Sequence, residues 1–216
     1  MTTRVAREDT MRKRYDRRYF DRWYRNGDAA AGRTALLRRK AALAVAMAEY
    51  HLGHPLRSVL DVGCGEGAWR APLLKLRPKL EYLGVDASEY AVARYGARRN
   101  LRFARFAQLE QLRFGPPVDL LVCSDVLHYV RAGELRRGLS GFAELCGGVA
   151  WIEVFCRGDA IEGDRLGFVR RSAAHYRRAF ADAGFTACGS NGYLSPALAR
   201  DAVALELIAP HACHAD

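Results

Sequence analysis

The cysteines of this chain form no pairs. Six cysteines stand singly in the sequence, and none belongs to a Cys-x-x-Cys motif. Scattered cysteines are typical of small buried side chains in a reducing compartment, and they argue against a disulfide framework or a zinc site. The single metal-like spacing, His211-Ala212-Cys213-His214, lies at the end of the chain, where we expect a disordered tail. We therefore expect no bound metal.

Long apolar segments are also missing. Residues 1–9 contain no apolar stretch that would serve as a signal peptide. The longest helical apolar run, residues 41–47, is too short to cross a bilayer. We expect a cytoplasmic protein.

Lysine is scarce in a basic chain. With only four lysines, the formal net charge of +10 is carried almost wholly by arginine. Much of it precedes residue 51, in runs such as Arg12-Lys13-Arg14 and Arg38-Arg39-Lys40. Such runs are most often solvated helix faces, although a nucleic-acid substrate would also need a basic cluster. A nucleic-acid substrate therefore stays open as an alternative.

The length suits one domain with a small additional segment. Of the 216 residues half are hydrophobic, which is enough for the core of an α/β domain. We divide the chain into an N-terminal helical cap segment (1–54), a main domain (55–210) and a tail (211–216).

The cap segment should contain two helices. The first carries Tyr15, Tyr19 and Trp23 four residues apart, an aromatic stripe that would attach the helix to the domain or line a pocket. The second should run from about Thr34 to Leu52 and end before Gly53. It should turn its large apolar side chains toward the sheet: Leu36, Leu37, Leu43, Val45, Met47 and Tyr50.

A glycine-rich turn organises the main domain. A short apolar strand, residues 58–62, runs directly into Gly63-Cys64-Gly65-Glu66-Gly67. Glycines at alternate positions permit backbone angles that side chains forbid, and they let a ligand lie against the main chain. A turn of this kind after the first strand is how α/β sheets form a nucleotide-sized site. The spacing is Gly-x-Gly-x-Gly, whereas the dinucleotide fingerprint is Gly-x-Gly-x-x-Gly.

Six further strands are expected after this turn. Residues 81–85 form an apolar strand that ends at Asp86, about twenty residues past the turn, where a ribose-binding carboxylate belongs. Residues 118–123 form a run that is apolar apart from Asp119, as in a parallel strand buried on both faces. The remaining strands should lie at 101–106, 149–155, 185–189 and 202–208.

Three segments together resemble one enzyme family. The first is the strand and turn around Asp61 and Gly63, the second is the strand ending at Asp86, and the third is Ser124-Asp125-Val126-Leu127-His128-Tyr129 after the fourth strand. In this order they resemble class I S-adenosylmethionine (SAM)-dependent methyltransferases, in particular bacterial enzymes that act on small molecules. The resemblance implies a three-layer α/β sandwich with a seven-stranded, mostly parallel sheet whose last strand is antiparallel.

The resemblance also implies a set of cofactor contacts. SAM would bind at the glycine turn, with Asp86 on the ribose hydroxyls and Asp61 on the methionine amino group, and S-adenosylhomocysteine (SAH) would be the product. Family members often place an acidic residue after the third strand for the adenine, but this chain has none before Glu110. The cofactor residues so implied are Asp61, Gly63, Cys64, Gly65, Gly67, Asp86, Ala87, Ala107, Gln108, Ser124 and Asp125.

The acceptor side is expected after the fourth and fifth strands. His128 and Tyr129 are the candidate catalytic residues, since a neutral imidazole there would take a proton from the acceptor. The alternative is that His128 only forms a hydrogen bond with the backbone. A carboxylate in an apolar strand needs a partner, which makes Glu153 a candidate for substrate binding. On the cap segment, Tyr19 and Trp23 would line the same pocket.

Some subclasses lack their residues here, and other functions stay open. An amino-methylating DNA enzyme would carry Asn/Asp-Pro-Pro-aromatic where this chain has residues 124–127, and Cys123 lacks the neighbouring proline of a 5-methylcytosine enzyme. The clustered carboxylates of the metal-dependent catechol type are not evident. A small-molecule acceptor is the default expectation. An RNA methyltransferase, a non-catalytic SAM-binding protein and an NAD-dependent oxidoreductase remain alternatives.

Overall fold

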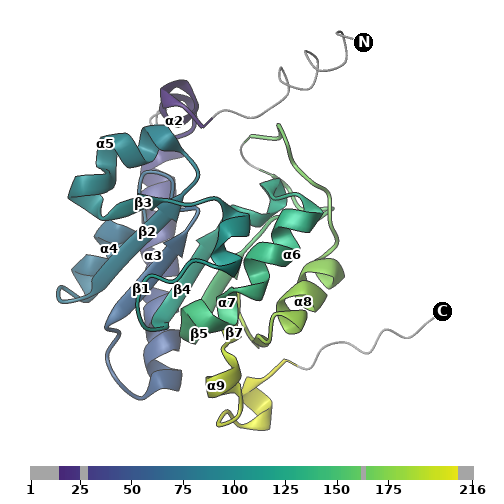
Figure 1. The fold of residues 1–216 in the computed structure, drawn as a ribbon. Helices are drawn as coiled ribbons and strands as arrows, with labels where there is room; N and C mark the ends of the chain where they lie inside the picture. Colours follow the sequence, from purple (N-terminus) through teal and green to yellow (C-terminus); the bar gives the residue numbers. More distant parts are fainter. Residues whose placement is uncertain (1–14, 25–28, 162–163, 209–216) are drawn as a thin grey trace.

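The apolar runs of the sequence form one sheet. In the computed structural model the sheet has seven strands in the order β3-β2-β1-β4-β5-β7-β6 (Figure 1). The residues described are 15–24, 29–161 and 164–208, without the side chains of 23, 24 and 29–31. The strands are β1 (Ser58–Val62), β2 (Glu81–Asp86), β3 (Leu101–Phe103), β4 (Val118–Ser124), β5 (Cys146–Glu153), β6 (Thr186–Gly189) and β7 (Gly192–Leu194).

The sheet is parallel except at its last strand. β1 pairs in parallel with β2 and β4, β2 with β3, and β4 with β5, whereas β7 runs antiparallel to β5 and β6. The predicted seven-stranded, mostly parallel sheet with an antiparallel last strand is confirmed. Because the first five strands share one direction, the carboxyl ends of β1, β2, β4 and β5 lie together on one side of the sheet.

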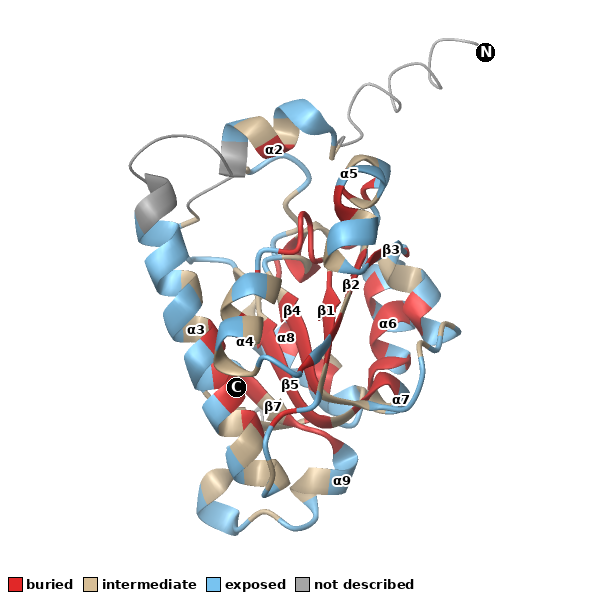
Figure 2. Ribbon diagram, turned by 90° about the vertical axis from the view of Figure 1, so that its left-hand side faces the viewer, coloured by how far each residue is buried: buried red, intermediate tan, exposed pale blue. Residues whose placement is uncertain are grey.

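Helices cover both faces of the sheet. One face packs against α3 (Ala29–Leu52), α4 (Arg70–Leu76) and α5 (Glu89–Arg99), and the other against η1 (Phe106–Glu110), η2 (Leu127–Tyr129), α6 (Ala132–Ser140), α7 (Phe142–Leu145) and α8 (Ala173–Asp182). Alternate strand residues feed the two cores: Val59 and Leu120 belong to the first, Leu60 and Leu121 to the second. The buried sheet between the helix layers is seen in Figure 2.

Different helices lie at the two ends of the sheet. α2 (Arg17–Tyr24) lies next to α5, above the carboxyl ends of the strands, and α9 (Pro196–Ala199) lies at the opposite end (Figures 1 and 2). In the described part of the chain, no helix is both long and apolar enough to span a membrane.

The strand predicted at residues 202–208 does not form. Residues 202–208 contain a turn and the short helix η3 (Ala204–Glu206) in place of a strand. The seventh strand is β7, which forms a tight hairpin with β6 through Ser190 and Asn191, at φ 45° and 66°. Two left-handed residues are typical of a two-residue hairpin turn, so the signal was Ser-Asn-Gly and not the later apolar run. The third strand is also shorter than expected, because the chain leaves the sheet after Phe103.

The long helix α3 packs through small residues. It begins at Ala29 and not near Thr34, and it buries Ala41, Ala44, Val45 and Ala48 against the sheet. The larger Leu36, Leu43 and Tyr50 are 50%, 45% and 70% exposed, so the expectation that they face the sheet is wrong.

Candidate functional site

The turn after β1 is shaped by its backbone. All three of its glycines have positive φ, at 70°, 54° and 77° for Gly63, Gly65 and Gly67. The amides of Gly63 and Cys64 both donate to the carbonyl of Val85 at the end of β2 (2.8 and 3.1 Å). A Cβ at Gly63 would lie 2.2 Å from a methyl of Val126, in the segment after β4. Glycine is therefore required where these two segments meet.

Asp86 closes the turn from the neighbouring strand. Its two carboxylate oxygens accept from the amides of Gly65 and Ser88, each at 2.7 Å. Burial raises the pKa of Asp86, while the backbone N–H groups of Gly65, Ser88 and Ala87 oppose that shift. The sequence thus correctly placed an acid beside the glycine turn. Its role toward a ribose stays a prediction.

Asp61 is buried beneath the turn. It is 2% exposed, and its Oδ2 accepts from the hydroxyl of Tyr82 at 2.6 Å. Burial raises the pKa of Asp61 to about 7, the Tyr82 hydrogen bond lowers it, and the charge of Asp86 raises it. Tyr82 was not anticipated from the sequence, since its position at the start of an apolar strand predicted only core packing.

A second polar cluster lies where β4 and β5 end. Oε2 of Glu153 accepts from the hydroxyl of Ser124 (2.8 Å), and Oε1 pairs with Nζ of Lys40 on α3 (2.5 Å). The amide of Asp125 donates to the carbonyl of Glu153 (3.0 Å). The expectation that Glu153 has a polar partner is met, but by Lys40, 113 residues away, which no sequence pattern singled out.

His128 lies inside an aromatic enclosure. It is 1% exposed, and its ring centroid is 4.2 Å from that of Tyr129, 5.4 Å from Phe155 and 5.3 Å from Phe168. Its carbonyl accepts from the amide of Val169 (2.8 Å). The half-buried Tyr129 donates to the carbonyl of Asp164 (2.6 Å). The loop after β5 thus covers both residues, and their catalytic role stays a prediction.

The cap segment rests on the same edge of the sheet. The hydroxyl of Ser88 donates to the carbonyl of Tyr15 (2.6 Å), and Phe20, 2% exposed, stacks on Tyr90 of α5 (5.7 Å). Burial raises the pKa of Tyr15, with further contributions from Tyr129, Asp86 and Asp164, so the Tyr15 ring lies among residues of the site.

Two residues of the aromatic stripe were proposed for the pocket wall. Tyr19 packs edge-on against Tyr15, with ring centroids 5.1 Å apart. The side chain of Trp23 lies outside the described residues. Tyr15, which was not selected from the sequence, is the member of the stripe that the structure brings next to Asp86 and Tyr129.

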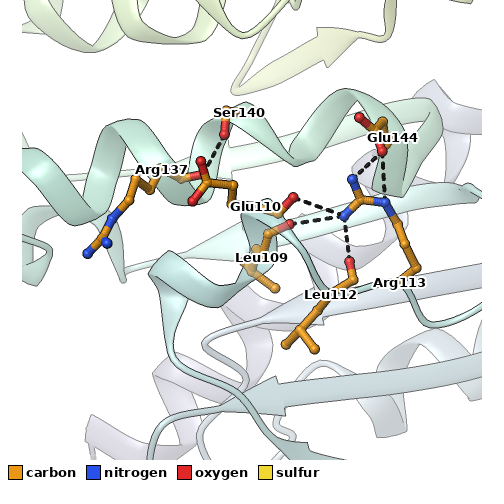
Figure 3. A network of polar contacts seen from close by, with 7 residues as sticks. All are labelled: Leu109, Glu110, Leu112, Arg113, Arg137, Ser140 and Glu144. Carbon is orange, nitrogen blue, oxygen red and sulfur yellow. Dashed lines mark hydrogen bonds and ion pairs between the residues drawn. The ribbon is translucent and has the colours of Figure 1, made fainter.

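Residues expected near the adenine lie on η1. The side-chain oxygen of Gln108 accepts from the amide of Arg105 (2.8 Å), and Ala107 and Gln108 line a surface recess between η1 and α6. Arg113 fixes the end of η1, because its guanidinium donates to the carbonyls of Leu109, Glu110 and Leu112 and pairs with Glu144 of α7 (Figure 3). These contacts hold the segment in place, and the adenine assignment stays a prediction.

Comparison with known families places the site in a recognised domain. Residues 60–148, from β1 into β5, match the family described as a methyltransferase domain. This part of the chain is a methyltransferase domain. The match includes the glycine turn, Asp86 and the segment after β4. A comparison with curated proteins finds no match.

Solved structures share the fold of this methyltransferase. A SAM-dependent methyltransferase from Archaeoglobus fulgidus is 16% identical, with a TM-score of 0.58 over 77% of this chain and 72% of that one. A magnesium protoporphyrin IX methyltransferase from Synechocystis, solved with bound SAH, is 22% identical, with a TM-score of 0.60 over 82% and 89%. A sugar N-methyltransferase from Streptoalloteichus is 20% identical, with a TM-score of 0.54 over 68% and 78%.

The residues of the methyltransferase fit an adenosyl ligand. The three glycines of the turn offer main chain without side chains, and the carboxylate of Asp86 lies on the neighbouring strand. No group of three or more His, Cys, Asp or Glu residues with metal-binding geometry occurs within residues 15–24, 29–161 and 164–208. His211, Cys213 and His214 lie outside the described residues.

Proposed function

We propose that this methyltransferase moves the methyl group of SAM to a small-molecule acceptor in the cytoplasm. The observation that carries the proposal is the glycine-rich turn at Gly63–Gly67 with Asp86 beside it, within a matched methyltransferase domain. The sulfonium of SAM supplies an activated methyl group, so the protein has to align the acceptor, exclude water and receive a proton.

The cofactor would be held by three groups. Backbone of residues 63–67 would hold the methionine and ribose portion, and Asp86 would accept from the ribose hydroxyls as a charge-assisted pair. In the structure Asp86 already binds the turn through Gly65, which orients its carboxylate. Asp61, ordered by Tyr82, would reach the amino group directly or through water. Ala87 and the η1 residues Ala107 and Gln108 would flank the adenine.

The acceptor would lie over the ends of β4 and β5. Ser124, Asp125 and Glu153 are at this edge, and Tyr129 and the cap segment face it. Tyr19 and Trp23 would line the pocket from the cap segment, and Tyr129 would serve the chemistry, whereas the enclosed His128 would position Tyr129. A small acceptor is favoured because structures of this fold include porphyrin and sugar methyltransferases.

The test is methyl transfer to a pool of metabolites. The protein is incubated with SAM labelled in its methyl group and a small-molecule cell extract, and labelled products are counted. The wild type should label a discrete product, and Asp86→Ala should lose that product. Asp201→Asn, which removes an exposed carboxylate next to α9, should retain it.

The same assay covers the alternative acceptor. Purified RNA replaces the metabolite pool in a parallel reaction, because the basic chain leaves that substrate open. Label in RNA and none in metabolites would contradict a small-molecule acceptor. Label in neither, with SAH still bound, would favour a non-catalytic SAM-binding protein.

A further inference from the structure

Asp125 has an unusual backbone. Its φ is +60°, one of four non-glycine residues with positive φ in the described part of the chain. A side chain in this region costs free energy and persists where surrounding structure enforces it, often at functional sites. Here the enforcing contacts are the hydrogen bond from its amide to the carbonyl of Glu153 and the packing of Val126 on Gly63. The second contact places Asp125 beside the glycine turn.

The charges around Asp125 do not cancel. Asp125 and Glu153 are both carboxylates, and Lys40 is the cation that pairs with Glu153. One negative charge therefore remains at the ends of β4 and β5. Asp125 is exposed to solvent, whereas His128 on the same segment is 1% exposed inside its aromatic enclosure. An acceptor at this edge can thus reach the carboxylate of Asp125 but not the imidazole.

We propose that Asp125 is the proton acceptor of the transfer and that, with Glu153 beside it, it selects an acceptor whose nucleophile is an amine. Lys40 is a positioning residue, because it holds Glu153 and limits the negative charge. The inference rests on the proposed function and specifies its acceptor class.

The step balances with Asp125 as base. An ammonium acceptor binds against the carboxylate and gives it one proton, which leaves a nitrogen lone pair. That lone pair forms the N–C bond to the methyl group while the C–S bond breaks and its electrons stay on sulfur. The products are a methylammonium compound, SAH and one proton on Asp125, which solvent then removes.

The groups that face Asp125 agree with this role. Partial burial of the carboxylate and the charge of Glu153 raise the pKa of Asp125 to about 6, while Lys40 on α3 and Ser124 on β4 lower it. Tyr129 on η2 is another titratable neighbour, and its own pKa is raised to about 12 by burial, Asp164 and Asp125. The carboxylate is therefore anionic above pH 6 and ready to take a proton.

Binding of two SAM analogues tests the contact without an acceptor. Sinefungin carries a protonated amine at the position of the transferred methyl, whereas SAH carries nothing there. Calorimetric titrations at pH 7.5 should show sinefungin binding at least about tenfold more tightly than SAH, as one charge-assisted hydrogen bond would give. In Asp125→Asn, which tolerates the same backbone conformation, the ratio should fall to about one while SAH still binds.

Two further variants separate charge from folding. Asp201→Asn should keep the wild-type ratio. Lys40→Met should keep or enlarge it, because removal of the lysine leaves the site more negative. A ratio near one in the wild type, or an unchanged ratio in Asp125→Asn, would overturn the inference while SAH binding still supported the proposed function. A wild type that binds neither analogue would overturn both.

The acceptor class has its own readout. Labelled products from the metabolite pool are passed over a cation exchanger at pH 5, where amines are charged. Label retained on the exchanger supports the inference, and label in the unretained fraction would overturn the choice of an amine.

Discussion

Asp61 shows how a single residue of the site is held at a cost in stability. Its carboxylate is buried and accepts a hydrogen bond from the hydroxyl of Tyr82. Burial raises the pKa of this carboxyl from its ordinary value of 3.8 to about 7, so the folded state binds more protons than the unfolded state between those pH values. Stability should therefore fall as pH rises from about 4 to about 7, and the loss is complete above that range.

The pH dependence of Asp61→Asn tests this cost. The variant keeps an oxygen for Tyr82 but cannot ionise, so it should lose less stability than the wild type between pH 5 and pH 8. The difference in melting temperature should grow with pH, corresponding to a few kcal/mol at most. Asp201→Asn is the control for loss of an exposed carboxylate. Parallel melting curves for wild type and Asp61→Asn across this range would contradict the assignment.

At the residue scale the sequence revealed single residues but not their partners. Asp61, Asp86 and the three glycines were found because a local motif fixes them on one strand end and one turn. Lys40 pairs with Glu153 across 113 positions, and Tyr15 lies beside Asp86 from the segment just before α2. No local pattern encodes such contacts, since they depend on how whole elements pack.

At the scale of elements, the buried ring of Phe20 packs α2 against the domain. The helix has eight residues, too few to be stable alone, and Phe20 packs it on Tyr90 of α5. Tyr15, just before α2, lies beside Asp86. The position of this element should therefore influence the cofactor site.

Phe20→Ala should release α2 without unfolding the domain. Loss of a buried phenylalanine costs about 3–5 kcal/mol, more than a short helix can supply by itself. Trypsin should then cut faster at the arginines of α2, SAH affinity should fall several-fold, and the main melting transition should stay in place. The control is Phe103→Ala, whose ring is 42% exposed on β3. Equal cleavage rates in wild type and Phe20→Ala would show that α2 is held by other contacts.

Elements with a strong local signal were predicted well. The central strands β1, β2 and β4 are mostly apolar and lie where expected. The prediction of a strand at residues 202–208 was wrong. These residues have the apolar pattern of a strand, but the hairpin of β6 and β7 already pairs with β5 on that side of the sheet. In α3, Ala41, Ala44 and Ala48 face the sheet because small side chains allow close packing, which the search for large apolar residues overlooked.

At the scale of the whole molecule, the fold and the function have different support. The order of the sheet and the two helix layers define a methyltransferase architecture, and the family match covers the glycine turn and Asp86. One fold serves many acceptors, so the acceptor has to be argued from Asp125, Glu153 and the cap segment. Cofactor binding should therefore be measured before the acceptor is sought.

Calorimetric titration of SAH into wild type and Asp86→Ala tests the central claim most directly. The account predicts saturable one-to-one binding to the wild type and affinity at least about tenfold lower in Asp86→Ala, since the variant loses charge-assisted hydrogen bonds to the ribose. Unchanged affinity in the variant, or binding of NADH in preference to SAH, would contradict it.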